Sequence, residues 1–163
     1  MKLAASAPTV NPLNAETKPA IGYAYRPLIY ITSGAKADLP GHRGPGRDLS
    51  IMSQRNRGTL PRVPAARIDD AARFLLHSRQ IEIVKFKERY CALMEGRVAR
   101  GSCAPGTLSR ISPPDWTPEP VNAGDTLICS CAARSDDECH RFWLAPYLLA
   151  AGWRVVLDGK DLL

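Results

Sequence analysis

The sequence predicts a small α/β protein: a single domain with a mainly parallel sheet, flanking helices and a long basic loop after the first strand. Two short apolar runs, LIYITS at 28–33 and RVVLDG at 154–159, end at turn residues, which is typical of buried strands. A third run, DTLICSCA at 125–132, precedes a polar loop and the helical pattern CHRFWLAPYLLAAGW. Strand, loop, helix and strand within about 30 residues predict a βαβ unit with parallel strands and a right-handed crossover.

The remaining elements are predicted from the spacing of apolar and turn-forming residues. IDDAARFLLH at 68–77 begins with acidic residues and continues with helical spacing, so it predicts a helix. IEIVKF at 81–86 fits either a strand or the start of a helix, and KERYCALMEG continues with helical spacing. Gly, Pro and Arg recur through 34–64, which predicts a long, partly ordered loop, and 102–125 predicts a surface connection. Pro146 is expected to kink the last helix or to split off its first turn.

Length and composition predict one domain. The chain has 163 residues, of which 45% are hydrophobic, enough for a core. We expect 27–163 to form the domain and 1–26, which has no period, to be a flexible N-terminal tail. No run approaches the roughly 18 to 20 apolar residues of a membrane span or contains the apolar segment of a signal peptide, so we predict a cytoplasmic protein with no membrane partner. Five cysteines in that setting predict reduced thiols.

The charge of the chain predicts an anionic partner. The net charge is +6, and the excess lies mainly in HRGPGRDLSIMSQRNRGTLPR and in the run from KFKERY to RVAR. A phosphate-bearing small molecule or a nucleotide fits this sign, as does nucleic acid. Neither the aromatic pattern of an RNA-binding sheet nor the cysteine and histidine spacing of a zinc finger is present, so the sequence does not indicate specific base readout. The sequence indicates no oligomeric state.

The segment CSCAARSDDECHR at 129–141 gathers the residues best suited to chemistry. Cys129 and Cys131 would lie on one side of a strand near its carboxyl end, where open α/β sheets bind ligands, and Cys139 and His140 would open the next helix. Three interpretations are open. Cys139 is a nucleophile or redox thiol, with His140 as base and Arg141 holding an anion. Alternatively, cysteines of this segment bind Zn²⁺ together with His140. In the third, the strand cysteines are small buried residues.

A longer stretch, LICSCAARSDDECHRFWLAPYL, resembles the signature of domain-of-unknown-function family 488. In that signature a strand ends in Cys, seven residues follow, and Cys-His-Arg starts a helix with a Leu-Ala pair; the matching positions are Cys131, Cys139, His140, Arg141, Leu144 and Ala145. IYITS and KFKERYCALM resemble the opening strand and the central helix of the family. The Gly-His that follows the first strand in the family is replaced by Ser33-Gly34. The resemblance implies a compact α/β domain with a Cys/Cys-His-Arg cluster at the carboxyl edge of the sheet.

These observations predict one site and one alternative. The site contains Cys139, His140 and Cys131 as catalytic residues and Arg141 as a ligand-binding residue, joined by Arg43 and Arg47 of the basic loop. Its ligand is a phosphate-bearing or nucleotide-like anion, and no cofactor is predicted, zinc being the alternative. The second interpretation is a non-enzymatic nucleic-acid-binding or regulatory protein that uses the basic loop 42–62, through Arg43, Arg47, Arg55, Arg57 and Arg62. Cys129 is expected in the core, and Trp116, Trp143 and Trp153 are expected to fill the core or an interface.

Overall fold

The computed structural model describes residues 26–52, 60–68, 75–76, 78–130 and 138–163. The predicted tail, apart from Arg26, and most of the predicted helix 68–77 lie outside these ranges. So do Cys131, Arg55 and Arg57.

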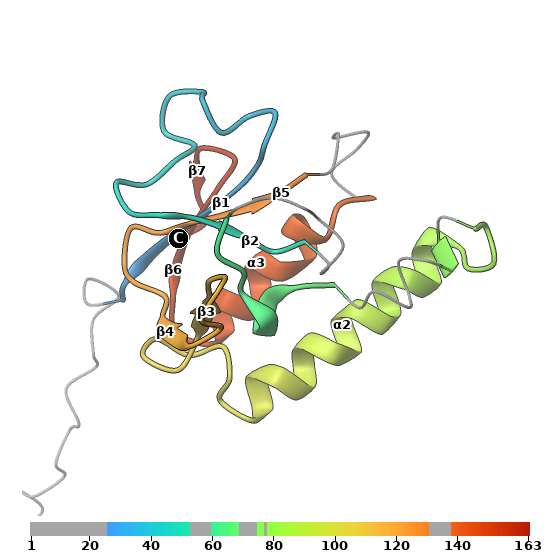
Figure 1. Cartoon of the computed structure of the whole chain (residues 1–163). Helices are drawn as coiled ribbons and strands as arrows, with labels where there is room; N and C mark the ends of the chain where they lie inside the picture. Colours follow the sequence, from blue (N-terminus) through green and yellow to red (C-terminus); the bar gives the residue numbers. More distant parts are fainter. Residues whose placement is uncertain (1–25, 53–59, 69–74, 77, 131–137) are drawn as a thin grey trace, which may run out of the picture.

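A five-stranded sheet forms the centre of the described chain (Figure 1). Its strand order is β2(Asp48–Ser50), β5(Thr126–Cys129), β1(Leu28–Ser33), β6(Arg154–Leu157) and β7(Lys160–Asp161). The first four strands are parallel, and β7 pairs antiparallel with β6. The predicted α/β class with a mainly parallel sheet is therefore confirmed.

One face of the sheet carries the hydrophobic core. Ile31 is in register with Leu127 on one side and with Leu157 on the other, and Leu49 continues the row on β2. Helix α3(His140–Ala150) packs on the sheet through an apolar face that includes Leu144. β5, α3 and β6 form the predicted βαβ unit, with β1 lying between its two strands. Residues paired in register on parallel strands face the same side of the sheet, so the apolar face continues to the carboxyl ends of the strands.

The loop 34–47 covers the opposite face, and its glycines allow it to lie close to the sheet. The Gly44 amide donates to the Thr126 hydroxyl at 2.9 Å. A Cβ placed on Gly44 would meet the Gly124 carbonyl oxygen at 2.1 Å and the Tyr30 ring at 2.4 Å. The predicted loop is thus present, but it leads into β2, a strand that we did not predict. β2 has only three residues, too few to produce a visible alternation of apolar and polar positions.

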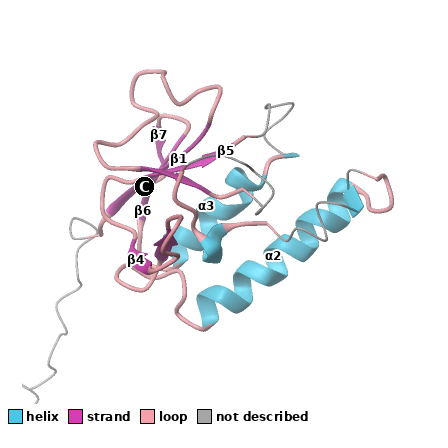
Figure 2. Ribbon diagram, viewed as in Figure 1, coloured by secondary structure: helices cyan, strands magenta, loops and turns pink. Residues whose placement is uncertain are grey.

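Helix α2(Ile83–Ala99) packs outside α3 (Figure 2). The helical alternative for 81–86 is therefore correct from Ile83 onward. Phe86 meets Trp143 edge-on with 5.8 Å between ring centroids. The Tyr90 hydroxyl donates to the Ala66 carbonyl at 2.9 Å and so ties α2 to the short 3-10 helix η2(Pro64–Ala66). α3 is continuous through Pro146, so its first turn is not split off.

The predicted surface connection contains a second, two-stranded sheet. β3(Ser109–Ile111) pairs antiparallel with β4(Pro118–Pro120). Buried Arg110 pairs with Glu119 and Asp125 and so joins this hairpin to the turn before β5. Strands of three residues carry almost no sequence signal of their own, and β4 contains two prolines, which is why this hairpin was not predicted. No helix in the described ranges is both long and apolar enough to cross a membrane.

Candidate functional site

Two cysteine thiols touch at the carboxyl edge of the sheet. Cys129 is the last residue of β5, and Cys139 is the N-cap residue of α3. Their Sγ atoms are 3.3 Å apart, and the residues are 0% and 2% exposed. Neither forms a disulfide. The burial of Cys129 agrees with its expected place in the core, but its contact with Cys139 makes it part of the candidate site.

Arg141 lies beside this thiol pair and is fully buried. Its Nη1 is 3.7 Å from Cys129 Sγ, while Nε and Nη2 donate to Asp158 Oδ2 at 3.3 and 3.0 Å. Burial lowers the pKa of the guanidinium, but hydrogen bonding to Asp158 and the nearby thiols outweigh it, so the pKa is raised above its ordinary value. Arg141 therefore keeps its positive charge next to the Cys129 sulfur.

Asp158 holds Arg141 and two further groups, and it was not among the predicted site residues. Lys36 Nζ approaches Asp158 Oδ2 to 2.9 Å, and the Thr32 hydroxyl donates to Oδ1 at 3.1 Å. Burial raises the pKa of this carboxyl, but hydrogen bonds from Lys36 and Arg141 outweigh it and hold the pKa below its ordinary value of 3.8. The signal that could have identified it is Asp-Gly between β6 and β7, because both residues have positive φ, 46° and 79°, as a tight hairpin turn requires.

Two more polar side chains complete the edge. Ser33 is next to Cys129 in register, and its buried hydroxyl has no hydrogen-bond partner within the described chain. Neighbouring residues of parallel strands face the same way, so this hydroxyl lies on the thiol side of the sheet. On the other side, His42 Nδ1 is 3.3 Å from the Thr32 hydroxyl. The edge therefore contains thiols, a guanidinium, an ammonium, a carboxylate and an unpaired hydroxyl.

The described contacts of His140 are with Ile51 and Tyr90. Its Nε2 lies 3.2 Å from the Ile51 carbonyl oxygen, and its ring meets Tyr90 edge-on at 5.7 Å. The residue is 2% exposed. These contacts hold the start of α3 against the segment that follows β2, which is a structural role. The predicted role of His140 as a base remains a prediction.

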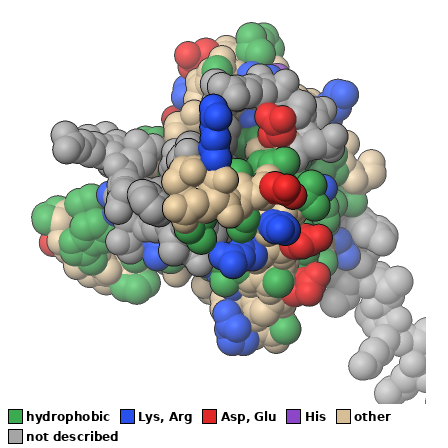
Figure 3. Space-filling view, turned by 90° about the vertical axis from the view of Figure 1, so that its right-hand side faces the viewer, with side chains coloured by type: hydrophobic (Ala, Val, Ile, Leu, Met, Phe, Trp, Pro, Cys, Tyr) green, Lys and Arg blue, Asp and Glu red, His purple; other side chains and the backbone are tan. Residues whose placement is uncertain are grey.

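The predicted ligand arginines of the basic loop lie elsewhere. Arg43 pairs with Asp38 at 3.3 Å and with Asp48, the first residue of β2, at 3.0 Å. Arg47 lies 3.7 Å from Glu119 of the β3–β4 hairpin. Both are at the amino-terminal end of β2, and the structure does not bring them to the thiols. Figure 3 shows basic and acidic side chains interspersed on the face that it presents, so the excess charge forms no single patch there.

The zinc alternative also depends on residues of this edge. Within the described ranges, no three His, Cys, Asp or Glu side chains gather closely enough to hold a metal ion. Cys131, a ligand in that alternative and a predicted catalytic residue, lies outside these ranges.

Comparison of the chain with protein-family models, with curated proteins and with solved structures found no match.

Proposed function

We propose that Cys129 and Cys139 are a redox-active dithiol that exchanges electrons with a thiol–disulfide couple of the glutathione class. The contact of the two Sγ atoms at 3.3 Å carries this proposal, because thiols so close need only a small movement to form a bond. The positive charge of Arg141 beside Cys129 supports it, since the thiolate is the reactive form.

The exchange takes place in two substitutions. The Cys139 thiolate attacks one sulfur of the partner disulfide, whose bond breaks, and one partner thiol leaves with a proton. The Cys129 thiolate then attacks the Cys139 sulfur, the second partner thiol leaves with a proton, and the Cys129–Cys139 bond closes. Two electrons and two protons have passed to the partner, and the reverse sequence reduces the pair again.

The positions of the two thiols support this division of roles. Cys139 is the N-cap residue of α3, where the helix dipole favours a thiolate. Cys129 lies under Arg141 and is fully buried, as suits the residue that attacks second. Because Cys139 is only 2% exposed, its reaction requires a local opening at the start of α3.

The geometry gives less support to Arg141 as the binder of an external anion. Nε and Nη2 already donate to Asp158, so a phosphate would have to displace that carboxylate from a buried position. We therefore propose that Arg141 stabilises the Cys129 thiolate rather than an external anion. The resemblance to family 488 remains a prediction.

Redox titration of the purified chain tests the dithiol. After equilibration in glutathione buffers and alkylation of the remaining thiols, mass spectrometry should show the loss of two hydrogens and a peptide that links Cys129 to Cys139. Cys129→Ser should stop at a mixed disulfide between Cys139 and glutathione. Cys91→Ser, which changes a cysteine on α2, is the matched control and should titrate like the wild type. Full retention of both thiols in glutathione disulfide, or a link from Cys139 to any other cysteine, would refute the proposal.

A further inference from the structure

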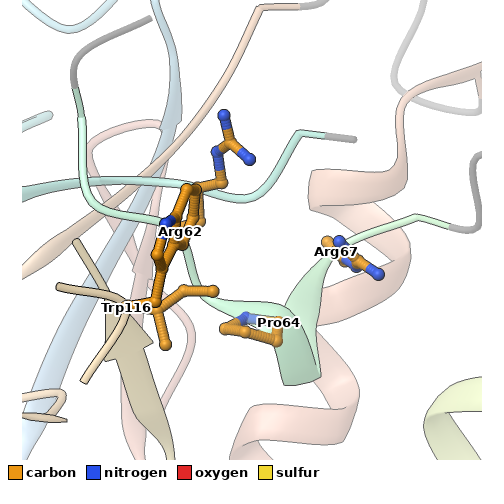
Figure 4. Close-up of a pocket in the computed structure, with 5 residues that line it drawn as sticks. Arg62, Pro64, Arg67 and Trp116 are labelled. Atoms are coloured by element: carbon orange, nitrogen blue, oxygen red, sulfur yellow. The ribbon is translucent and has the colours of Figure 1, made fainter. Parts of the chain in front are cut away.

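A pocket of about 270 Å³ lies between η2 and the β3–β4 hairpin. Five residues line it: Arg62, Pro64, Arg67, Ile111 and Trp116. Figure 4 shows Arg62 and Trp116 together on one side, Arg67 on the other and Pro64 between them. None of the thiol-site residues lines this pocket, so its role is separate from the dithiol.

Trp116 is presented to solvent by a strained backbone. This tryptophan, expected in the core or at an interface, is 48% exposed, whereas Trp143 and Trp153 are buried. Its φ is +52°, in the left-handed region that favours glycine. The Arg62 guanidinium lies 5.4 Å from the ring centroid. An exposed indole next to a guanidinium is a surface on which a planar base can stack.

The frame of the pocket is formed by hydrogen bonds that need no ligand. Arg62 and Ile111 exchange two backbone hydrogen bonds of 2.8 Å, which fixes one wall. The other wall is held to α2, because Arg97 Nη1 donates to the carbonyls of Ala65 and Arg67 at 3.1 and 2.8 Å. A preformed pocket loses little conformational entropy when a ligand binds.

The chemistry of the lining favours a small aromatic anion. The described residues of the lining include two guanidinium groups and no carboxylate. Arg67 forms no ion pair with another described residue, and a guanidinium can donate two parallel hydrogen bonds to a phosphate. The volume of about 270 Å³ is near the lower limit of roughly 300 Å³ for small-molecule sites, which suits a ligand of about one nucleotide.

We infer that this pocket binds a nucleoside monophosphate, with the base stacked on Trp116 and the phosphate held by Arg67. Arg62 lies beside the Trp116 ring and adds positive charge next to the stacked base. This site gives the predicted nucleotide-like anion a place other than the cysteine cluster.

Titration of the full chain with adenosine monophosphate tests the site. Binding should quench tryptophan fluorescence, because Trp116 is the exposed indole of the three, and Trp116→Phe should abolish the quench. Calorimetry should then give at least tenfold weaker binding for adenosine and for inorganic phosphate than for the monophosphate. Arg67→Ala should lower the affinity for the monophosphate at least tenfold. Arg89→Ala, which removes an exposed arginine of α2, should leave that affinity unchanged.

Three results would overturn the inference. They are the absence of monophosphate binding at millimolar concentration, wild-type affinity in Arg67→Ala with an unchanged melting temperature, and binding of single-stranded oligonucleotides without binding of the monophosphate. The last result would assign the pocket to nucleic acid. A Cys139→Ser variant should bind the monophosphate like the wild type, which keeps this test separate from that of the dithiol.

Discussion

At the scale of single residues, Asp158 connects the two faces of the sheet at their carboxyl edge. It accepts hydrogen bonds from Arg141 on the helix side, from Thr32 on the loop side and from Lys36 after β1. Only a residue that tolerates positive φ can occupy this turn position, and aspartate does so while supplying the charge that a buried guanidinium requires.

Asp158→Asn is expected to destabilise the protein by about 3 kcal/mol at neutral pH, because it leaves the buried Arg141 without a countercharge. Asparagine also tolerates the left-handed turn conformation, so the loss of stability reports the ion pair with Arg141 rather than a backbone change. Urea unfolding of both forms provides the measurement. Asp38→Asn, which changes an exposed carboxylate paired with Arg43, is the control and should cost under about 1 kcal/mol. Equal losses in the two variants would mean that Asp158 does not hold Arg141.

The same carboxyl predicts how stability responds to acid. The folded-state pKa of Asp158 lies below 3.8, so below that pH the unfolded chain takes up a proton before the folded chain does. The contribution of Asp158 is therefore complete above pH 3.8 and is lost as the pH falls through the lower folded value. Chemical unfolding across acid pH should show the difference between wild type and Asp158→Asn shrinking in this window, and a constant difference would contradict the prediction.

The sequence assigned Cys139 and Arg141 to the candidate site but placed Cys129, in the same segment, in the core, and it did not indicate the site residues that come from other segments. Cys139 and Arg141 were identified because a strand end and a helix start face the same edge. Asp158 and Lys36 belong to other segments, and their meeting with Arg141 is a consequence of strand order, which no local pattern reveals. Trp116 was expected in the core or at an interface because tryptophans are large and apolar, and only the hairpin geometry shows its exposure.

At the scale of elements, the loop 34–47 behaves as a layer of the fold. Gly44→Ala is expected to destabilise the protein by about 3 kcal/mol, because its Cβ would overlap the Gly124 carbonyl and the Tyr30 ring. Gly41→Ala is the matched control: it has positive φ but open space around it, so only the conformational cost of about 1 to 2 kcal/mol is expected. Thermal unfolding compares them, and a Gly44 variant as stable as the Gly41 variant would show that the loop does not lie against the sheet.

The elements that were predicted correctly have a strong internal pattern. β1 and β6 are apolar runs that end at turn residues, and α3 ends before Gly152, which has the positive φ of a helix terminus. β2, β3 and β4 have three residues each, so tertiary pairing rather than sequence periodicity determines them.

At the scale of the whole molecule, oxidation of the thiol pair should stabilise the fold. A Cys129–Cys139 bond closes a short loop between β5 and α3, and loop-closure entropy predicts a gain of roughly 2 to 3 kcal/mol in the free energy of unfolding. Guanidinium unfolding of oxidised and reduced protein measures it, with Cys129→Ser as the control that should not respond to the oxidant. A lower stability after oxidation would mean that the bond forms only with distortion of the site.

The position of β1 at the centre of the sheet also determines the order in which the chain can fold during synthesis. Tyr30 pairs with Thr126, which follows 96 residues later, and Leu28 pairs with Arg154, which follows 126 residues later. The ribosome therefore releases β1 long before β5 or β6 has been synthesised. Until then, the apolar side chains and backbone groups of β1 have no strand to pair with. The loop 34–47 cannot dock in this period either, because its hydrogen-bond partners Gly124 and Thr126 are synthesised equally late. Assembly of the sheet is thus delayed until β5, α3 and β6 have been synthesised.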